Sequence, residues 1–172
     1  LNILWVGRFT RQKGLDRLQV IIEDINAKYS NKIEWHIVGD GEERAIVSNL
    51  AVLHKNVTWH GHVPHAKISH FFSQASLFIS TSRWESFGLN VVEAQSFNIP
   101  SIAYNITGPK EIIVDGVSGY LVQSTEFFID KIIQVIEGDI KLKSNFSAQI
   151  CEKFAPHNIY SKLVALLKYA SH

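Results

Sequence analysis

The feature that most constrains the fold is a regular alternation of short apolar runs with longer amphipathic stretches. The apolar runs are about four to six residues long and rich in β-branched and aromatic side chains, which is typical of buried strands. Three of the runs end at a glycine, at Gly7, Gly39 and Gly61. The predicted strands cover residues 3–6, 33–38, 57–60, 77–80, 100–104 and 120–122.

Helical periodicity fills the segments between the predicted strands. One helix face carries Leu15, Leu18, Ile22, Ile25 and Tyr29, and shorter patterns cover residues 45–53, 68–72 and 89–97. Because strand and helix alternate about five times, the sequence predicts a Rossmann-like, doubly wound α/β fold, with a parallel sheet of about six strands and helices on both faces. Beyond the last strand, helical patterns at 126–136, 141–154 and 159–169 predict a helical C-terminal tail.

Length and charge limit the domain organisation and the class of partner. The 172 residues fit one domain, expected to span residues 1–172. The chain has no methionine and begins inside an apolar run at Leu1, so we expect it to be a piece of a longer protein. A net charge of +1 argues against a nucleic-acid partner held mainly by charge. Cys151, the only cysteine, is expected to be a buried thiol on a helix face.

The segment after the first predicted strand, Gly7 to Gly14, carries two cations. It lacks the glycine spacing of a dinucleotide fingerprint, and no Ser or Thr follows a Gly-Lys pair as in a P-loop. Arg8 lies at the end of the strand and Lys13 at the entrance to the next helix. Together they can bind a polyanion, because the planar guanidinium group donates two parallel hydrogen bonds and the ammonium group adds a compact positive charge. On this segment alone, two solvated surface cations are an equally good interpretation.

A second polar segment, residues 82–94, follows the fourth predicted strand. Ser86 is a good N-cap for a helix over residues 87–97, which would leave the N–H groups of residues 87–89 free to bind an oxyanion. Glu85 lies just before this helix and Glu93 lies within it, and carboxylates accept hydrogen bonds from sugar hydroxyls. The pattern indicates a phosphate at the helix start with hydroxylated groups on either side. A capping serine with two structural or surface glutamates is the alternative.

Taken in order, these elements resemble the C-terminal half of the group 1, or family 4, retaining glycosyltransferases. The resemblance runs from residue 2 to about residue 123. It rests on Gly7-Arg8 with Lys13-Gly14, Gly39-Asp40-Gly41, Trp59-x-Gly61, Glu85 to Glu93, and Glu111-Ile112-Ile113-x-Asp115-Gly116-x-x-Gly119. One departure is the segment from Thr107 to Lys110, where the family more often has two glycines. The family has two Rossmann-like domains facing a cleft, the GT-B architecture, and its C-terminal domain binds a nucleotide-sugar donor.

The resemblance implies roles for individual residues. Arg8 and Lys13 would hold the diphosphate and stabilise it as it leaves, and Glu85 would contact the donor sugar; these three are the candidate catalytic residues. Glu93 would accept the ribose hydroxyls, and Val63 would lie near the base. The candidate donor-binding residues are Gly7, Arg8, Lys13, Val63, Glu85, Ser86, Phe87, Gly88, Leu89 and Glu93.

No metal or other cofactor is expected, because the family is usually independent of metals and the sequence has no Asp-x-Asp pair. Histidines crowd into one segment, but no cysteine or carboxylate joins them at ligand spacing, so surface and loop positions are favoured over a zinc site. The four histidines are His60, His62, His65 and His70.

The resemblance implies a hexosyl- or glycosyltransferase that moves a sugar from a nucleoside diphosphate to a glycan, lipid or other acceptor with retention. The expected partners are the nucleotide sugar, that acceptor and an N-terminal acceptor domain, without which the chain would be inactive. The alternatives are a non-catalytic nucleotide-sugar-binding module or pseudoenzyme subunit, and half of a phosphorylase or epimerase. No apolar run approaches the roughly 18 residues of a membrane span, so we expect a cytoplasmic protein, free or peripheral at the inner face of a membrane.

Overall fold

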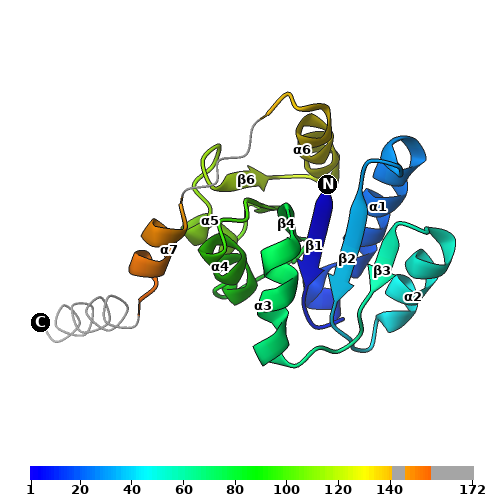
Figure 1. Cartoon of the computed structure of the whole chain (residues 1–172), viewed down its shortest axis with the longest axis horizontal. Helices are drawn as coiled ribbons and strands as arrows, with labels where there is room; N and C mark the ends of the chain where they lie inside the picture. The colour runs from blue at the N-terminus through cyan, green and yellow to red at the C-terminus, as the bar shows by residue number, and fades with distance from the viewer. Residues whose placement is uncertain (141–145, 156–172) are drawn as a thin grey trace, which may run out of the picture.

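Six parallel strands form one sheet in the order β3-β2-β1-β4-β5-β6. The computed structural model describes residues 1–140 and 146–155. Its strands are β1 (Asn2–Val6), β2 (Glu34–Val38), β3 (Val57–Trp59), β4 (Leu77–Ser80), β5 (Ser101–Tyr104) and β6 (Gly119–Val122). Each predicted strand is confirmed to within one residue at either end. The order reverses between β1 and β4, which is the switch point of a doubly wound sheet, and Figure 1 shows β1 and β2 pointing to the same edge.

Helices connect the strands much as the periodicity predicts. They are α1 (Leu15–Tyr29), α2 (Arg44–Leu53), α3 (His65–Gln74), α4 (Leu89–Ser96), α5 (Pro109–Ile112), α6 (Thr125–Glu137) and α7 (Ser147–Lys153), with a short 3₁₀ helix, η1 (Arg11–Lys13). Neither η1 nor α5 was predicted, because both helices are too short to show a period. The predicted helix at 159–169 and residues 141–145 lie outside the described residues. Among the helices of the described ranges, none is long and apolar enough to cross a membrane.

Alternate residues of each strand face opposite layers of helices, which produces two cores. Ile3 and Trp5 of β1 pack with α1, α2 and α6, whereas Leu4 and Val6 pack with α3, α4 and α5. The same alternation continues in β4 and β5. Strands buried on both faces explain why the sequence reads as continuous apolar runs rather than as alternating ones. The predicted helices on both faces are confirmed.

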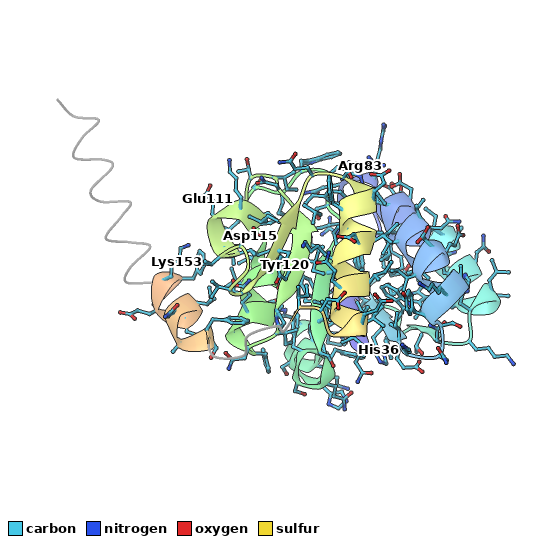
Figure 2. All side chains as sticks on the ribbon, turned by 90° about the horizontal axis from the view of Figure 1, so that it is seen from above. His36, Arg83, Glu111, Asp115, Tyr120 and Lys153 are labelled. Atoms are coloured by element: carbon cyan, nitrogen blue, oxygen red, sulfur yellow. The ribbon has the colours of Figure 1, made fainter. Side chains whose placement is uncertain are left out.

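The short helix α7 lies against the α4 layer (Figure 1). Phe146 and Ile150 bury their side chains there, and the Asn98 side-chain oxygen accepts hydrogen bonds from the N–H groups of Phe146 and Ser147, at 3.0 and 2.9 Å. Cys151 follows Ile150 and faces solvent, so the expectation of a buried thiol is wrong. Figure 2 shows Lys153 of α7 beside Glu111 of α5, whose carbonyl oxygen accepts from the lysine ammonium group.

Replacing Ser124 by alanine is expected to destabilise the protein by about 1 kcal/mol, because its side-chain oxygen caps α6. The oxygen accepts a hydrogen bond from the Phe127 N–H at 3.4 Å. Urea unfolding of both variants measures the difference. Ser73→Ala is the control. The hydroxyl of this exposed serine donates to the carbonyl of His70 within its own helix, so its loss should change stability by less than about 0.5 kcal/mol. Equal values for the two variants would contradict the capping role.

Candidate functional site

Two of the three predicted catalytic residues meet at the switch point of the sheet. The Lys13 ammonium group donates to Glu85 Oε2 at 2.5 Å, and the side chains are only 17% and 14% exposed. Lys13 ends η1 and leads into α1, whereas Glu85 follows β4, so the pair joins loops 72 residues apart. Ligands of open α/β sheets bind at this edge, where the strand order reverses. The structure therefore puts an ion pair of low exposure at the position where a ligand is expected.

The loop that carries Lys13 is fixed by side chains of the neighbouring strands. Trp5 Nε1 donates to the Thr81 hydroxyl at 3.0 Å, and that hydroxyl donates to the Lys13 carbonyl at 2.8 Å. The Arg83 N–H donates to the Gln12 carbonyl at 2.8 Å. These bonds hold the backbone on both sides of the ion pair, so Lys13 and Glu85 face each other. Trp5 and Thr81 are positioning residues that were not predicted from the sequence.

A cavity of about 280 Å³ lies at the carboxyl edge of the sheet, over the ends of β1 and β2. Gly7 and Arg8 line it from the first loop, and Val63 lines it from the loop that follows β3. His62 and Asp40 also contribute to its wall. The structure thus brings Gly7, Arg8 and Val63 together, three of the predicted donor-binding residues.

Phe9 anchors the loop that presents Arg8 to this cavity. Its ring is fully buried between Trp5 and Trp59, with ring centroids 5.7 and 5.9 Å away. Its N–H donates to the Asp40 carbonyl at 2.9 Å, and its own carbonyl accepts from the Glu43 N–H at 3.1 Å. Arg8 is therefore exposed on a backbone that is held from both sides. No local pattern in the sequence distinguishes Phe9 from any other aromatic residue of a loop.

The start of α4 differs from the prediction. The helix begins at Leu89 and its N-cap is Gly88, in the left-handed region at φ 85°, so Ser86 is exposed and does not cap it. Glycine adopts this conformation at little cost, and the turn delays the helix by two residues. The first N–H groups without an acceptor inside the helix therefore start at Leu89 rather than at Phe87. Asn90 Nδ2 donates to the Val6 carbonyl at 2.8 Å, which ties this helix start to the end of β1.

The segment from Thr107 to Lys110, where two glycines were expected from the resemblance, packs directly on the loop before α4. Gly108 has φ 90°, and a Cβ there would lie 3.0 Å from the Phe87 carbonyl carbon and oxygen. A side chain would therefore push the two loops apart. The side chains of Ser86, Phe87 and Leu89 are exposed, so any contribution from these three predicted residues comes from their backbone.

Glu93 lies on α4 next to the loop that contains Val63. Its Oε1 is 3.6 Å from Nε2 of His65, the first residue of α3. Burial raises the pKa of Glu93, and the nearby His65 opposes that shift. A carboxylate in a partly desolvated position favours hydrogen-bond donors such as hydroxyl groups. The structure thus places Glu93 close to the segment predicted to lie near the base.

The crowded histidines do not form a metal cluster. Within residues 1–140 and 146–155, no three histidine, cysteine or acidic side chains are arranged to hold a metal ion. His60 pairs instead with His36 of β2, with 3.1 Å between His36 Nδ1 and His60 Nε2. Burial, and then the neighbouring His36, lower the pKa of His60. His60 and His70 both pack against the Phe71 ring, whereas His62 lines the cavity beside Arg8 and His65 lies near Glu93.

Known proteins match almost the whole chain. The family model described as "Glycosyl transferases group 1" matches residues 2–152. The amylovoran biosynthesis glycosyltransferase AmsD of Erwinia amylovora is 35% identical over 152 residues, which cover 85% of this chain and 41% of that protein. An uncharacterized 41.2 kDa protein in the cps region of Klebsiella pneumoniae is 32% identical over 155 residues, 90% of this chain and 41% of that protein.

A solved structure shows the same architecture. A mutant of TarM from Staphylococcus aureus, in complex with fondaparinux, α-GlcNAc-glycerol and UDP, superposes with a TM-score of 0.82 at 27% identity over 96% of this chain and 35% of that one. The chain therefore spans 41% of the length of each of the two relatives and 35% of the TarM chain. The match to the family model covers the sheet and the helices from η1 through α6 and most of α7, and on this basis the chain belongs to the group 1 glycosyltransferases.

Proposed function

We propose that the chain is the donor-binding, C-terminal part of a retaining glycosyltransferase. It would bind a nucleoside-diphosphate sugar and, together with an N-terminal acceptor domain, transfer the sugar to a glycan, lipid or other acceptor. The observation that carries the proposal is the Lys13–Glu85 ion pair at the switch point, beside the cavity lined by Arg8. The cation can bind the diphosphate of the donor, and the carboxylate beside it can accept hydrogen bonds from the hydroxyl groups of the sugar.

The cations supply what the leaving group requires. When the bond between the anomeric carbon and the diphosphate oxygen breaks, the electron pair leaves with the nucleoside diphosphate, which then carries about two to three negative charges. The acceptor hydroxyl oxygen forms the new bond to the anomeric carbon, and its proton passes to the departing diphosphate oxygen. Charge-assisted hydrogen bonds contribute roughly 1.5–3 kcal/mol each, so Arg8 and Lys13 together account for several powers of ten in rate. With two fixed cations, no divalent ion is needed, and we propose that the reaction proceeds without one.

Glu85 changes its partner when the donor binds. Without a donor, it neutralises Lys13. A diphosphate carries more charge than a carboxylate and takes over the lysine, which frees Glu85 to accept a hydrogen bond from a hydroxyl group of the sugar. The same carboxylate therefore holds Lys13 in position before binding and recognises the sugar afterwards.

The nucleoside would extend into the cavity of about 280 Å³, with the base near Val63 and the ribose near Glu93. Glycines at Gly7 and Gly39 keep the walls of this cavity free of side chains where the loops after β1 and β2 approach each other. TarM was solved with UDP, so UDP is the first nucleotide to test.

Isothermal titration of UDP, GDP and ADP into the chain tests the donor-binding part of this proposal. At least one of the three should bind near or below millimolar concentration, and EDTA should not change its affinity. Binding of none of them would overturn the proposal. Binding that EDTA abolishes would overturn its metal-independent form.

Turnover is tested with the full-length protein and a radiolabelled nucleotide sugar. Transfer of label to an acceptor, lost in Lys13→Ala and Glu85→Ala, supports the enzyme. Nucleotide binding without transfer to any acceptor would instead indicate a non-catalytic nucleotide-sugar-binding subunit. Cleavage of the donor without an added glycosyl acceptor would indicate a phosphorylase or epimerase.

A further inference from the structure

A second cavity, of about 310 Å³, opens at the ends of β5 and β6. Its polar lining consists of Arg17, Arg83, Tyr104, Asn105 and Gln123, and we call it the arginine cavity. The side chains come from α1, from the loop after β4 and from the ends of the last two strands. It lies at the carboxyl edge of the sheet, like the candidate donor site, but shares no lining residue with the cavity beside Arg8.

The two guanidinium groups have unequal partners. Arg83 forms an ion pair with Asp16, yet its Nε is buried and finds no hydrogen-bond acceptor among the residues that the structure describes. Arg17 lies over the Tyr104 ring, 4.2 Å from its centroid, and forms no ion pair within residues 1–140 and 146–155. Asp16 does not line the cavity, and the charged side chains among the described residues that do line it are the two arginines.

The remaining lining residues suit a polar ligand. The Tyr104 hydroxyl shares a hydrogen bond of 2.8 Å with Thr125 Oγ1. Burial raises the pKa of Tyr104, so its hydroxyl stays protonated near neutral pH, although Arg17 and Arg83 oppose the shift and Glu126 adds to it. Asn105 and Gln123 add amide groups that can donate or accept. The aromatic face of Tyr104 is already covered by Arg17, which holds that guanidinium at the wall of the cavity.

Arg83 Nε has no exposed surface, so a ligand in the cavity would contact the part of this side chain that is exposed, 29% of it, rather than the Nε–H. A planar guanidinium fork binds phosphate and carboxylate oxygens well, and two forks in one cavity fix the orientation of such a group. We propose that the arginine cavity binds an oxyanion, a phosphate or carboxylate carried by a small polar molecule other than the nucleotide sugar. Figure 2 shows Arg83 on the α1 side of the molecule, away from His36 on the α3 side, which separates this cavity from the histidine pair.

Arginine-detected NMR tests the proposal directly. The chain is labelled with ¹⁵N, and the Nε–H signals of Arg17 and Arg83 are followed while inorganic phosphate or glucuronate is added at constant ionic strength. Both signals should shift and saturate with at least one of the two probes. Arg17→Gln should raise the dissociation constant about tenfold, as expected for one lost charge-assisted contact. Gln123→Ala, at an exposed position, gives a second and milder variant that leaves the charge unchanged.

Controls separate this cavity from the candidate donor site and from general charge effects. Lys13→Gln should leave the dissociation constant at the arginine cavity unchanged, and so should Lys55→Gln, which removes an exposed positive charge elsewhere. No saturable shift with either probe would overturn the proposal. Loss of binding with Lys13→Gln, but not with Arg17→Gln, would assign the anion to the donor site and also overturn it. Because UDP takes no part in the titration, failure of the proposed function would leave this result unaffected.

Discussion

Replacing Lys13 by alanine is expected to weaken UDP binding by about 1.5–3 kcal/mol, roughly 10- to 150-fold in Kd. The ammonium group sits at the switch point with little exposure to water, so its attraction for a diphosphate is screened less than that of a surface lysine. Arg8→Ala should have an effect of the same size because it removes the second cation. Isothermal titration with UDP measures each change.

Two further variants test this explanation, and neither is expected to weaken the binding of UDP. Lys55→Ala removes an exposed lysine away from the site and should leave UDP affinity unchanged. Glu85→Gln removes the carboxylate that competes for Lys13, so the affinity for UDP itself should increase, while the preference for a UDP-sugar over UDP should fall. Unchanged UDP affinity in both Lys13→Ala and Arg8→Ala would remove these two residues from the site.

Gly39→Ala is expected to destabilise the protein by more than about 3 kcal/mol. Gly39 has φ 142°, and a Cβ added there would lie 1.9 Å from the Gly7 carbonyl oxygen and 3.1 Å from the Phe9 ring. Both neighbours belong to the loop that carries Arg8, and neither can move without breaking the buried packing of Phe9. Urea unfolding followed by circular dichroism measures the loss.

Gly61→Ala separates crowding from backbone strain in this test. Gly61 also has a positive φ, 70°, but no atom lies within 4 Å of an added Cβ. Gly61→Ala should therefore lower the free energy of unfolding only by the cost of holding alanine in the left-handed region, about 1–2 kcal/mol. A Gly39 variant no less stable than the Gly61 variant would show that the loops after β1 and β2 do not approach as closely as described.

The sheet and the long helices could be predicted because their signal is local and repeated. The α1 helix places five apolar residues on one face, and all five are buried, from Leu15 to Tyr29. Helix ends and very short helices could not be predicted in the same way. Serine is a favoured N-cap residue, which is why Ser86 was predicted to cap α4, but Gly88 in the left-handed region determines where the helix starts. Cys151 was placed on the wrong side because α7 is only seven residues long, too few to define a face.

The candidate site was predicted in its residue types but not in its internal contacts. Arg8, Lys13 and Glu85 stand out because they follow predicted strands beside glycines, which is a local feature. That Lys13 and Glu85 touch depends on the strand order, which reverses at β1 and β4. The bonds from Thr81 to Lys13 and from Asn90 to Val6 cross 68 and 84 residues, and contacts so distant in sequence leave no periodic trace.

The hydrogen bonds from Trp5 to Thr81 and from Thr81 to Lys13 also affect how this fold can be re-engineered. A hydroxyl at residue 81 serves as both acceptor and donor, so the loop that carries Lys13 takes its position from the next strand in the sheet rather than from the helix that it begins. If residues 8–14 were exchanged for the loop of a relative, the new loop would therefore lack the hydrogen bonds that give it its conformation. A designer of chimaeras from this family has to treat residues 5, 8–14 and 81 as one transferable module.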